Sequence, residues 1–482
     1  MIARDGPPVA SVRLTEPLLP KVMQPRGLDQ LRRIPIAAFL TVLADVTATS
    51  FGALLLPAAT GLPASAGVHL YLMSTTMGQL AASLFSGFPY ATAGATIELV
   101  PLLIPITALL DPQWPACHRA STLLAAYTMT SALVGFLLLC VSRFRLGILF
   151  RCIPFIVLKA ALTGVGLFMM VEGIKTGGTL ADLGLSSLLE AGAMTRVLCT
   201  IVLCSCLALV QHTCRSPVAI VAFLAAATVS FHALPLTGKP KLLAPWWFTE
   251  SEDGAGDPGT LSVSSSPLGL LPLFSLANVH WDVLPRALPY SLSCCLVHAL
   301  CTITDLISIE AVATARPAAS AEDATRPPAA AAPMDLDLEL GSIGMANLFA
   351  ALVGTMPNYV QLSPSIANTN FSRGTRASGG ARAGPWCAAL EALSLLAVSQ
   401  VAAAVPRAVV GAFMIHMGLG FMGEGAETMR HTASTFDKVL LSILVLPHHP
   451  PPGPWTRPQP LLTIRPFAYA ALRSSWCSCH RS

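Results

Sequence analysis

Ionisable side chains inside apolar segments are the residues of this sequence that could do chemistry. Hydrophobic residues make up 54% of the 482 residues and charged residues only 11%, whereas a water-soluble chain carries roughly 25% charged residues. Such a chain is expected to cross a membrane many times. Ionisable groups in hydrocarbon are costly and usually mark a path for ions or substrate. The sequence has few such groups, and the candidates are Asp45, Glu98, Lys159, Asp305, Glu310, Glu391 and His416.

Two segments in separate halves of the chain share one pattern. They read GFPYATAGATIELVP, with Pro89 near its start, and GTMPNYVQLSPSIAN, with Pro357 near its start. Because proline fits the first turn of a helix, the pattern predicts half-helices over 89–110 and 357–369, with Glu98 about two turns into the first. Paired half-helices in matching positions of two halves are the best sequence pointer to a transporter's substrate site.

The elements that must position these segments are membrane spans of about 20 apolar residues. The basic N-terminus is predicted to be cytoplasmic, and Arg143, Arg145 and Arg151 follow the fourth span on the same side. Seven elements precede a long loop, the broken one third, and the second half repeats this order, so an inverted 7+7 repeat is expected. The other predicted spans are 35–58, 68–87, 121–141, 153–173, 195–213, 217–235, 287–312, 340–355, 386–404, 407–422 and 438–446.

The predicted fold class is therefore an all-α polytopic membrane protein with a core and a gate domain, its last span apparently cut short near Leu446. Residues 1–33 are a cytoplasmic tail, and the loop 236–285 is non-cytoplasmic. Residues 313–333 are a disordered linker by composition, and 447–482 are a disordered, aberrant tail with no span.

Other classes of protein find no support. The sequence has no GxSxG, HExxH, P-loop or strand-linked GxGxxG pattern, so no enzyme and no cofactor are predicted. Most of the 13 cysteines lie in apolar runs without zinc-binding spacing, and no metal site is expected. The net charge of +4 is modest, and no basic, aromatic-rich patch suggests nucleic acid.

Residues 34–446 resemble the SulP family, the sulfate-permease group of anion transporters. The resemblance rests on IPFIVLKAALTGVG in the fifth span and on the block DLDLELGSIGMANLFAALVGTMPNYVQLSPSIANTN. It implies a secondary transporter working by alternating access, with a small anion such as sulfate held between the half-helix N-termini. Nothing in the sequence resembles the STAS domain that ends most members. The implied substrate-binding residues are Phe51, Gly52, Thr92, Thr96, Glu98, Asp305, Glu310, Tyr359, Gln361, Ser363 and Ser365.

One departure from the family pattern leaves alternatives open. Many members carry an arginine in the second half-helix where this chain has Pro364, and Glu98 adds negative charge nearby. A proton-coupled carrier of a cationic or zwitterionic solute, such as a basic amino acid, is therefore a second hypothesis, and a divergent fungal vacuolar branch is similar in this respect. A non-transporting scaffold or decayed paralogue is a third. The expected partners are the substrate and the lipid bilayer; a homodimer, and the choice between plasma membrane and vacuole or other endomembrane, stay open.

Overall fold

A computed structural model describes most of the apolar part of the chain. The described residues are 33–56, 60, 62–147, 155–180, 183–190, 192–214, 217–233, 246–247, 270–314, 334–374 and 383–431. The predicted N-terminal tail up to residue 32, the linker from 315 to 333, the span at 438–446 and the tail at 447–482 lie outside them.

The described elements are mostly helices in the order that the apolar pattern predicts. Among the described residues, five helices are long and apolar enough to cross a membrane, and Ile97–Thr107 and Val218–Ala233 are shorter apolar helices. The helices longer than one turn are α2 (Ile34–Thr47), α4 (Ala64–Phe85), α5 (Val100–Thr107), α6 (Ala116–Arg143), α8 (Phe155–Gly178), α10 (Ala193–Cys214), α11 (Pro217–Ala233), α14 (Val283–Thr314), α15 (Leu336–Leu352), α16 (Leu362–Gly374), α17 (Gly384–Ser394), α18 (Val398–Ala404) and α19 (Arg407–His431).

Short elements interrupt the helices at a few places. Helix α2 continues through a π-helical turn, η1 (Ala48–Gly52), into α3 (Ala53–Leu55), and α5 is preceded by a 3₁₀ turn, η3 (Ile97–Leu99). Helix α9 (Leu185–Leu188) and the 3₁₀ turns η7 (Leu271–Leu273) and η8 (Leu276–Asn278) lie in connections. Two strands, β1 (Ala93–Ala95) and β2 (Asn358–Val360), form one small antiparallel sheet.

These strands correct one prediction. The fold is mostly helical as expected, but Pro89 and Pro357 precede strands rather than begin helices; the half-helices begin at Ile97 and Leu362. The physical reason is backbone hydrogen bonding. Extended residues inside a membrane must satisfy their N–H and C=O groups within the protein, and these two segments do so by pairing with each other.

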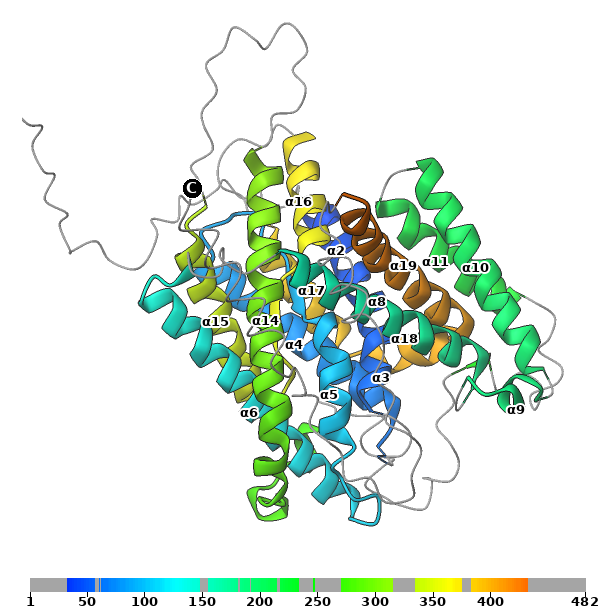
Figure 1. Cartoon of the computed structure of the whole chain (residues 1–482), viewed down its shortest axis with the longest axis horizontal. Helices are drawn as coiled ribbons and strands as arrows, with labels where there is room; N and C mark the ends of the chain where they lie inside the picture. The colour runs from blue at the N-terminus through cyan, green and yellow to red at the C-terminus, as the bar shows by residue number, and fades with distance from the viewer. Residues whose placement is uncertain are drawn as a thin grey trace, which may run out of the picture.

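The helices form two packed groups (Figure 1). Helix α15 packs against α6 and α4, and α17 packs against α4 and α2, whereas α8 packs against α19 and α10. Helices α10 and α11 lie at one side of the molecule beside α19, and α6 and α15 lie at the opposite side. We call α2, α4, α6, α14, α15 and α17 the sheet-side group, because it surrounds the two strands, and α8, α10, α11 and α19 the outer group.

Glycines allow the closest contact within the outer group. A Cβ atom on Gly173 of α8 would lie 2.8 Å from the carbonyl oxygen of Gly411 on α19, and one on Gly418 would lie 2.5 Å from that of Gly166. Small residues let membrane helices approach closely where lipid provides no hydrophobic drive between them. Helix α8 corresponds to the fifth predicted element of the first half and α19 to the fifth of the second, so this contact joins matching elements of the two halves.

Candidate functional site

The two strands bring the two half-helices together. Ala93 pairs with Val360, Gly94 with Tyr359 and Ala95 with Asn358. The pairing continues beyond the strands, because Thr96 N–H donates to the carbonyl of Pro357 (3.1 Å) and Gln361 N–H to that of Thr92 (2.9 Å). The half-helices start directly after this sheet, at Ile97 and Leu362. The two segments therefore meet as predicted, through strands instead of proline-led helical turns.

One face of α4 satisfies the outer edge of β1. Tyr71, Thr75 and Gln79 are four residues apart and so lie along one side of the helix. Ala93 N–H donates to Gln79 Oε1 (2.8 Å), Ala95 N–H donates to Thr75 Oγ1 (3.1 Å), and Tyr71 Oη–H donates to the carbonyl of Ala95 (3.2 Å). This role was not predicted, although three polar residues at helical spacing in an apolar span were a visible signal.

Helix α15 does the same for β2 with one side chain. Asn347 Oδ1 accepts from Asn358 N–H (3.0 Å), and its Nδ2 donates to the carbonyl of Asn358 (2.8 Å). Helices α4 and α15 are the second elements of the two halves, so equivalent helices hold the outer edges of the two strands. The sheet is thereby closed on both sides within the protein, as a membrane interior requires.

A buried polar cluster lies beside the sheet, and we call it the Glu98 cluster: Thr96, Glu98, His298 and Tyr359. Tyr359 Oη–H donates to Glu98 Oε1 (3.1 Å), and Thr96 Oγ1 lies 3.1 Å from His298 Nδ1. The rings of His298 and Tyr359 lie edge to face with centroids 6.2 Å apart. Within the described residues, Glu98 Oε2 and His298 Nε2 are buried and have no hydrogen-bond partner.

The position of Glu98 differs from the one expected. The expected position was about two turns into a helix beginning at Pro89, but Glu98 lies in the first turn of η3. The cause is the extended backbone before Ile97. A carboxyl group in a first helical turn lies near the N–H groups that have no intrahelical partner, so Glu98 sits where a bound anion would otherwise be expected.

His298 was not predicted as a site residue. It lies on α14 seven residues before Asp305, which is about two helical turns, so both side chains project from the same side of that helix. That spacing was the available signal. The structure adds that His298 is fully buried and contacts a residue from each half-helix segment.

The two predicted carboxylates of α14 separate. Asp305 Oδ2 accepts from Leu362 N–H (3.3 Å), so it caps the start of α16 at the sheet. Glu310 Oε1 accepts from Met334 N–H (3.2 Å), just before α15. Asp305 therefore lies where the two half-helix segments meet, whereas Glu310 binds the backbone just before α15, near the end of α14.

The hydroxyl and amide groups of the second segment also divide. Ser363 is exposed in the first turn of α16, and Gln361 is half-buried with its Nε2 3.4 Å from the carbonyl of Ala95. Ser365 is fully buried, and its Oγ lies 3.1 Å from the N–H and 3.4 Å from the carbonyl of Thr92. Ser365 and Thr92 thus hold the two segments together, while Ser363 is exposed.

Phe51 and Gly52 lie in the π-helical turn η1. Both are buried, and the Phe51 ring contacts Phe413 of α19 with centroids 6.3 Å apart. Gly52 abuts Gly67 of α4, where a Cβ atom on Gly52 would lie 2.7 Å from Val68 Cα. Phe51 therefore touches the outer group, and Gly52 permits close packing of α2 on α4.

The remaining intramembrane groups lie away from the sheet. Ser394 Oγ–H of α17 donates to Asp45 Oδ2 of α2 (3.0 Å), and Glu391 is buried one turn earlier on α17. His416 is half-buried on α19. The side chain of Lys159 lies outside the described residues.

Glu339, which the sequence analysis left unassigned, holds the turn before the first segment. Its carboxylate accepts from Ser86 Oγ–H (2.7 Å), Gly87 N–H (2.8 Å) and Phe88 N–H (2.9 Å). Because Glu339 lies in the first turn of α15, it links the second half of the chain to the turn that leads into β1.

Two half-helices that meet at a small sheet, inside a bundle whose halves repeat the same element order, define a membrane transporter of the inverted-repeat class. The chain belongs to the Sulfate permease family, which matches residues 39–444. The predicted family is thereby confirmed, and its members are transporters rather than enzymes.

Solved structures confirm the predicted 7+7 fold. The transmembrane domain of BicA, a bicarbonate transporter of a cyanobacterium, aligns with a TM-score of 0.61 at 16% identity and covers 88% of this chain and 97% of that domain. The murine Slc26a9 anion transporter in its inward-facing state aligns with a TM-score of 0.58 at 14% identity, over 88% of this chain and 65% of that one. No curated protein matches the sequence significantly.

Proposed function

We propose that this chain is a secondary carrier of a small inorganic anion, such as sulfate or bicarbonate, which binds where the two half-helices meet. The observation that carries the proposal is the pairing of β1 with β2, which places the starts of η3 and α16 next to each other. Helix N-termini present unpaired N–H groups and partial positive charge to an anion. The exposed hydroxyl of Ser363 adds a hydrogen-bond donor at the same place.

We propose that a titrating group compensates the charge at this site. Pro364 stands where many family members have an arginine, and Glu98 and Asp305 both lie at half-helix starts. An anion next to an ionised Glu98 would be repelled, whereas a buried carboxyl group without a counter-charge is far less costly as the neutral acid. We therefore propose that Glu98 takes up a proton when the anion binds.

The same carboxylates favour a second candidate function. If Glu98 and Asp305 stay ionised during transport, they would attract a cationic or zwitterionic solute such as a basic amino acid. Membership of the Sulfate permease family and the fold of anion transporters favour the anion. The alternative is kept because it makes the opposite prediction about Glu98.

Uptake into proteoliposomes tests both. The purified protein would be reconstituted, and labelled sulfate, bicarbonate and arginine would be offered at two external pH values, with protein-free vesicles as background. We expect anion uptake that increases when the outside is acidified. Saturable arginine uptake without anion uptake would replace the proposal by the cationic alternative, and no uptake of any solute by folded protein would contradict both.

Two further proposals concern the membrane in which the protein resides and its oligomeric state. We propose residence in the plasma membrane or in a vacuolar or other endomembrane, to be decided by microscopy of a tagged chain. A homodimer is the assembly that we propose to test, by native mass spectrometry of the protein in nanodiscs. A single monomeric species at all protein concentrations would reject it.

A further inference from the structure

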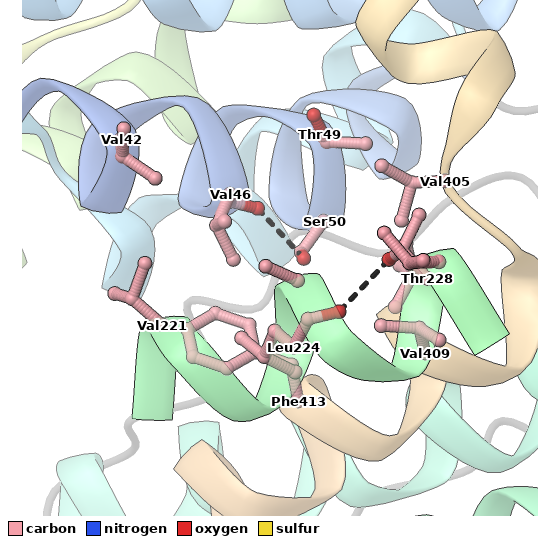
Figure 2. A pocket seen from close by; sticks show the side chains of 13 residues that line it. Val42, Val46, Thr49, Ser50, Val221, Leu224, Thr228, Val405, Val409 and Phe413 are labelled. Atoms are coloured by element: carbon pink, nitrogen blue, oxygen red, sulfur yellow. Dashed lines mark hydrogen bonds between the residues drawn. The ribbon is translucent and has the colours of Figure 1, made fainter. Parts of the chain in front are cut away.

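An apolar cavity of about 270 Å³ lies between the two helix groups (Figure 2). Helix α2 with η1 forms one wall, α11 forms the second, and α19 with the residues just before it forms the third. Most of the lining side chains are aliphatic. The aliphatic and aromatic members that Figure 2 labels are Val42, Val46, Val221, Leu224, Val405, Val409 and Phe413.

The three hydroxyl groups in the lining are already satisfied. Thr49 Oγ1–H donates to the carbonyl of Asp45 (2.8 Å), Ser50 Oγ–H to that of Val46 (2.8 Å), and Thr228 Oγ1–H to that of Leu224 (2.9 Å). Figure 2 shows the last two bonds. The cavity thus offers no free donor to an ion or a polar solute, and an apolar cavity of this kind stays dry.

The cavity lies at the depth of hydrocarbon. Its α2–η1 wall, 42–50, is the middle of the span Ile34–Leu55, and its α11 wall, 221–229, is the middle of Pro217–Ala233. In a bilayer whose hydrocarbon core is about 30 Å thick, the middle of a span is surrounded by lipid tails. Val42 is 44% exposed and Val229 is 66% exposed, so the cavity reaches the lipid-facing surface at both of these residues.

We propose that this cavity binds one acyl chain of a membrane phospholipid, which enters between Val42 and Val229. The ligand class follows from the satisfied hydroxyls, the aliphatic walls and the opening at mid-bilayer depth. Free polar solutes are excluded because the cavity cannot replace their hydration.

The position of the cavity means that a bound acyl chain would affect movement between the two helix groups. Its α2 wall belongs to the sheet-side group, where η1 packs on α4, the helix that satisfies the edge of β1. Its other walls, α11 and α19, belong to the outer group. An acyl chain therefore contacts both groups at once, and its occupancy would hinder any movement of one group against the other. This consequence, unlike the binding itself, rests on the proposed transport function.

Photo-crosslinking tests the binding. The full chain would be placed in nanodiscs of a phosphatidylcholine that carries a diazirine near the middle of one acyl chain, and labelled peptides would be identified by mass spectrometry. We expect enriched labelling of the peptides containing Val46, Ala225 and Val409. Val46→Phe, which fills the cavity, should remove the enrichment, and the milder Ala225→Leu should reduce it.

Val202→Phe is the matched control, because Val202 is 59% exposed on α10 and does not line the cavity. It should leave the labelling pattern of the three peptides unchanged. Thermal unfolding in the nanodisc would confirm that each variant is folded; if Val46→Phe fails to fold, Ala225→Leu decides. Labelling of the three peptides no stronger than that of α10, or equal labelling in wild type and a folded filled variant, would overturn the proposal.

A second outcome would also overturn it. If a photoreactive amino acid at position 42 crosslinks to another peptide of this chain instead of lipid, protein fills the cavity. Neither measurement requires transport, so a failure of the proposed anion carrier leaves this inference standing, and the reverse is equally true. Substrate flux in Val46→Phe would then report separately whether the bound chain slows the carrier.

Discussion

The two half-helix segments, residues 86–107 and 354–374, share one backbone geometry but use different chemistry. The first is held by the carboxylate of Glu339 at its start and carries Glu98 at its helix N-terminus. The second is held at its start by neutral hydroxyls, since Ser74 and Ser131 donate to the carbonyls of Met356 and Thr355, each at 2.6 Å. Its capping carboxylate, Asp305, comes from another helix.

This difference assigns different roles to the two halves. The two pseudo-symmetric segments meet at the sheet because each strand needs the other as the hydrogen-bond partner of its backbone. The first segment carries a carboxyl group of its own, Glu98, whereas the second carries none, so protonation of a carboxyl group acts on the first segment directly. The second segment presents an exposed hydroxyl, Ser363. We infer that the first segment responds to protons and the second mainly to the substrate.

The largest loss of stability is expected from Glu339→Ala, which removes the carboxylate that holds the start of the first segment. Three donors would lose a charged acceptor, and because unsatisfied buried groups cost about 1–3 kcal/mol each, the free energy of unfolding should fall by about 3 kcal/mol or more. Thermal unfolding in detergent measures it. Ser131→Ala is the matched substitution at the second segment, and it should lower the free energy of unfolding by only about 1 kcal/mol. Equal decreases in the two variants would contradict the proposed difference between the two segments.

Glu98→Gln should change the response to protons. The amide keeps an acceptor for Tyr359 Oη–H but cannot titrate. If the anion is carried with a proton, wild-type flux rises as external pH falls, and the variant should lose this dependence; if the substrate is cationic, preference should move from cations towards anions. Should the pH profile and the preference both stay as in wild type, Glu98 is structural.

His298→Gln separates the members of the Glu98 cluster. Glutamine can still bond Thr96 Oγ1 but cannot titrate, and because burial disfavours a cationic imidazole, anion flux at low pH should stay near that of wild type. A pH series of uptake, with circular dichroism as the folding control, measures this. A large loss of flux at low pH in the folded variant would show that His298 shares the proton with Glu98.

The sequence predicts those features that depend on residues within one segment, and it fails for those that depend on a partner far along the chain. The spans, their repeat and both half-helices follow from apolar runs, arginines and prolines within each segment. The strands at Ala93 and Asn358 were not predicted because each is stabilised by a partner in the other half of the chain. Glu98 was selected as a candidate because a carboxyl group stands out among apolar residues, but its predicted position two turns into a helix was wrong for the same nonlocal reason.

Side-chain roles at the site needed the structure. Ser363 and Ser365 look equivalent in the sequence, and only the bonds to Thr92 distinguish the buried hydroxyl from the exposed one. His298 and the Tyr71–Thr75–Gln79 face had visible spacing signals, but nothing in a single helix shows which neighbouring backbone such residues meet. The carry-over of substrate-binding residues from the family therefore stays a prediction for all eleven of them.

The smallest effects are expected from the two serines, and they test whether the second segment divides into a binding and a holding part. Ser363→Ala removes an exposed hydroxyl at the start of α16, so KM for the anion should rise while thermal stability stays unchanged. Ser365→Ala removes the buried hydroxyl beside Thr92, so stability should fall by about 1 kcal/mol while KM stays near wild type. Initial rates across anion concentrations and melting curves of the same preparations measure both. The exchanged pattern, with KM following Ser365 and stability following Ser363, would show that the substrate reaches the buried side of the sheet and that the binding site lies between Thr92 and Ser365.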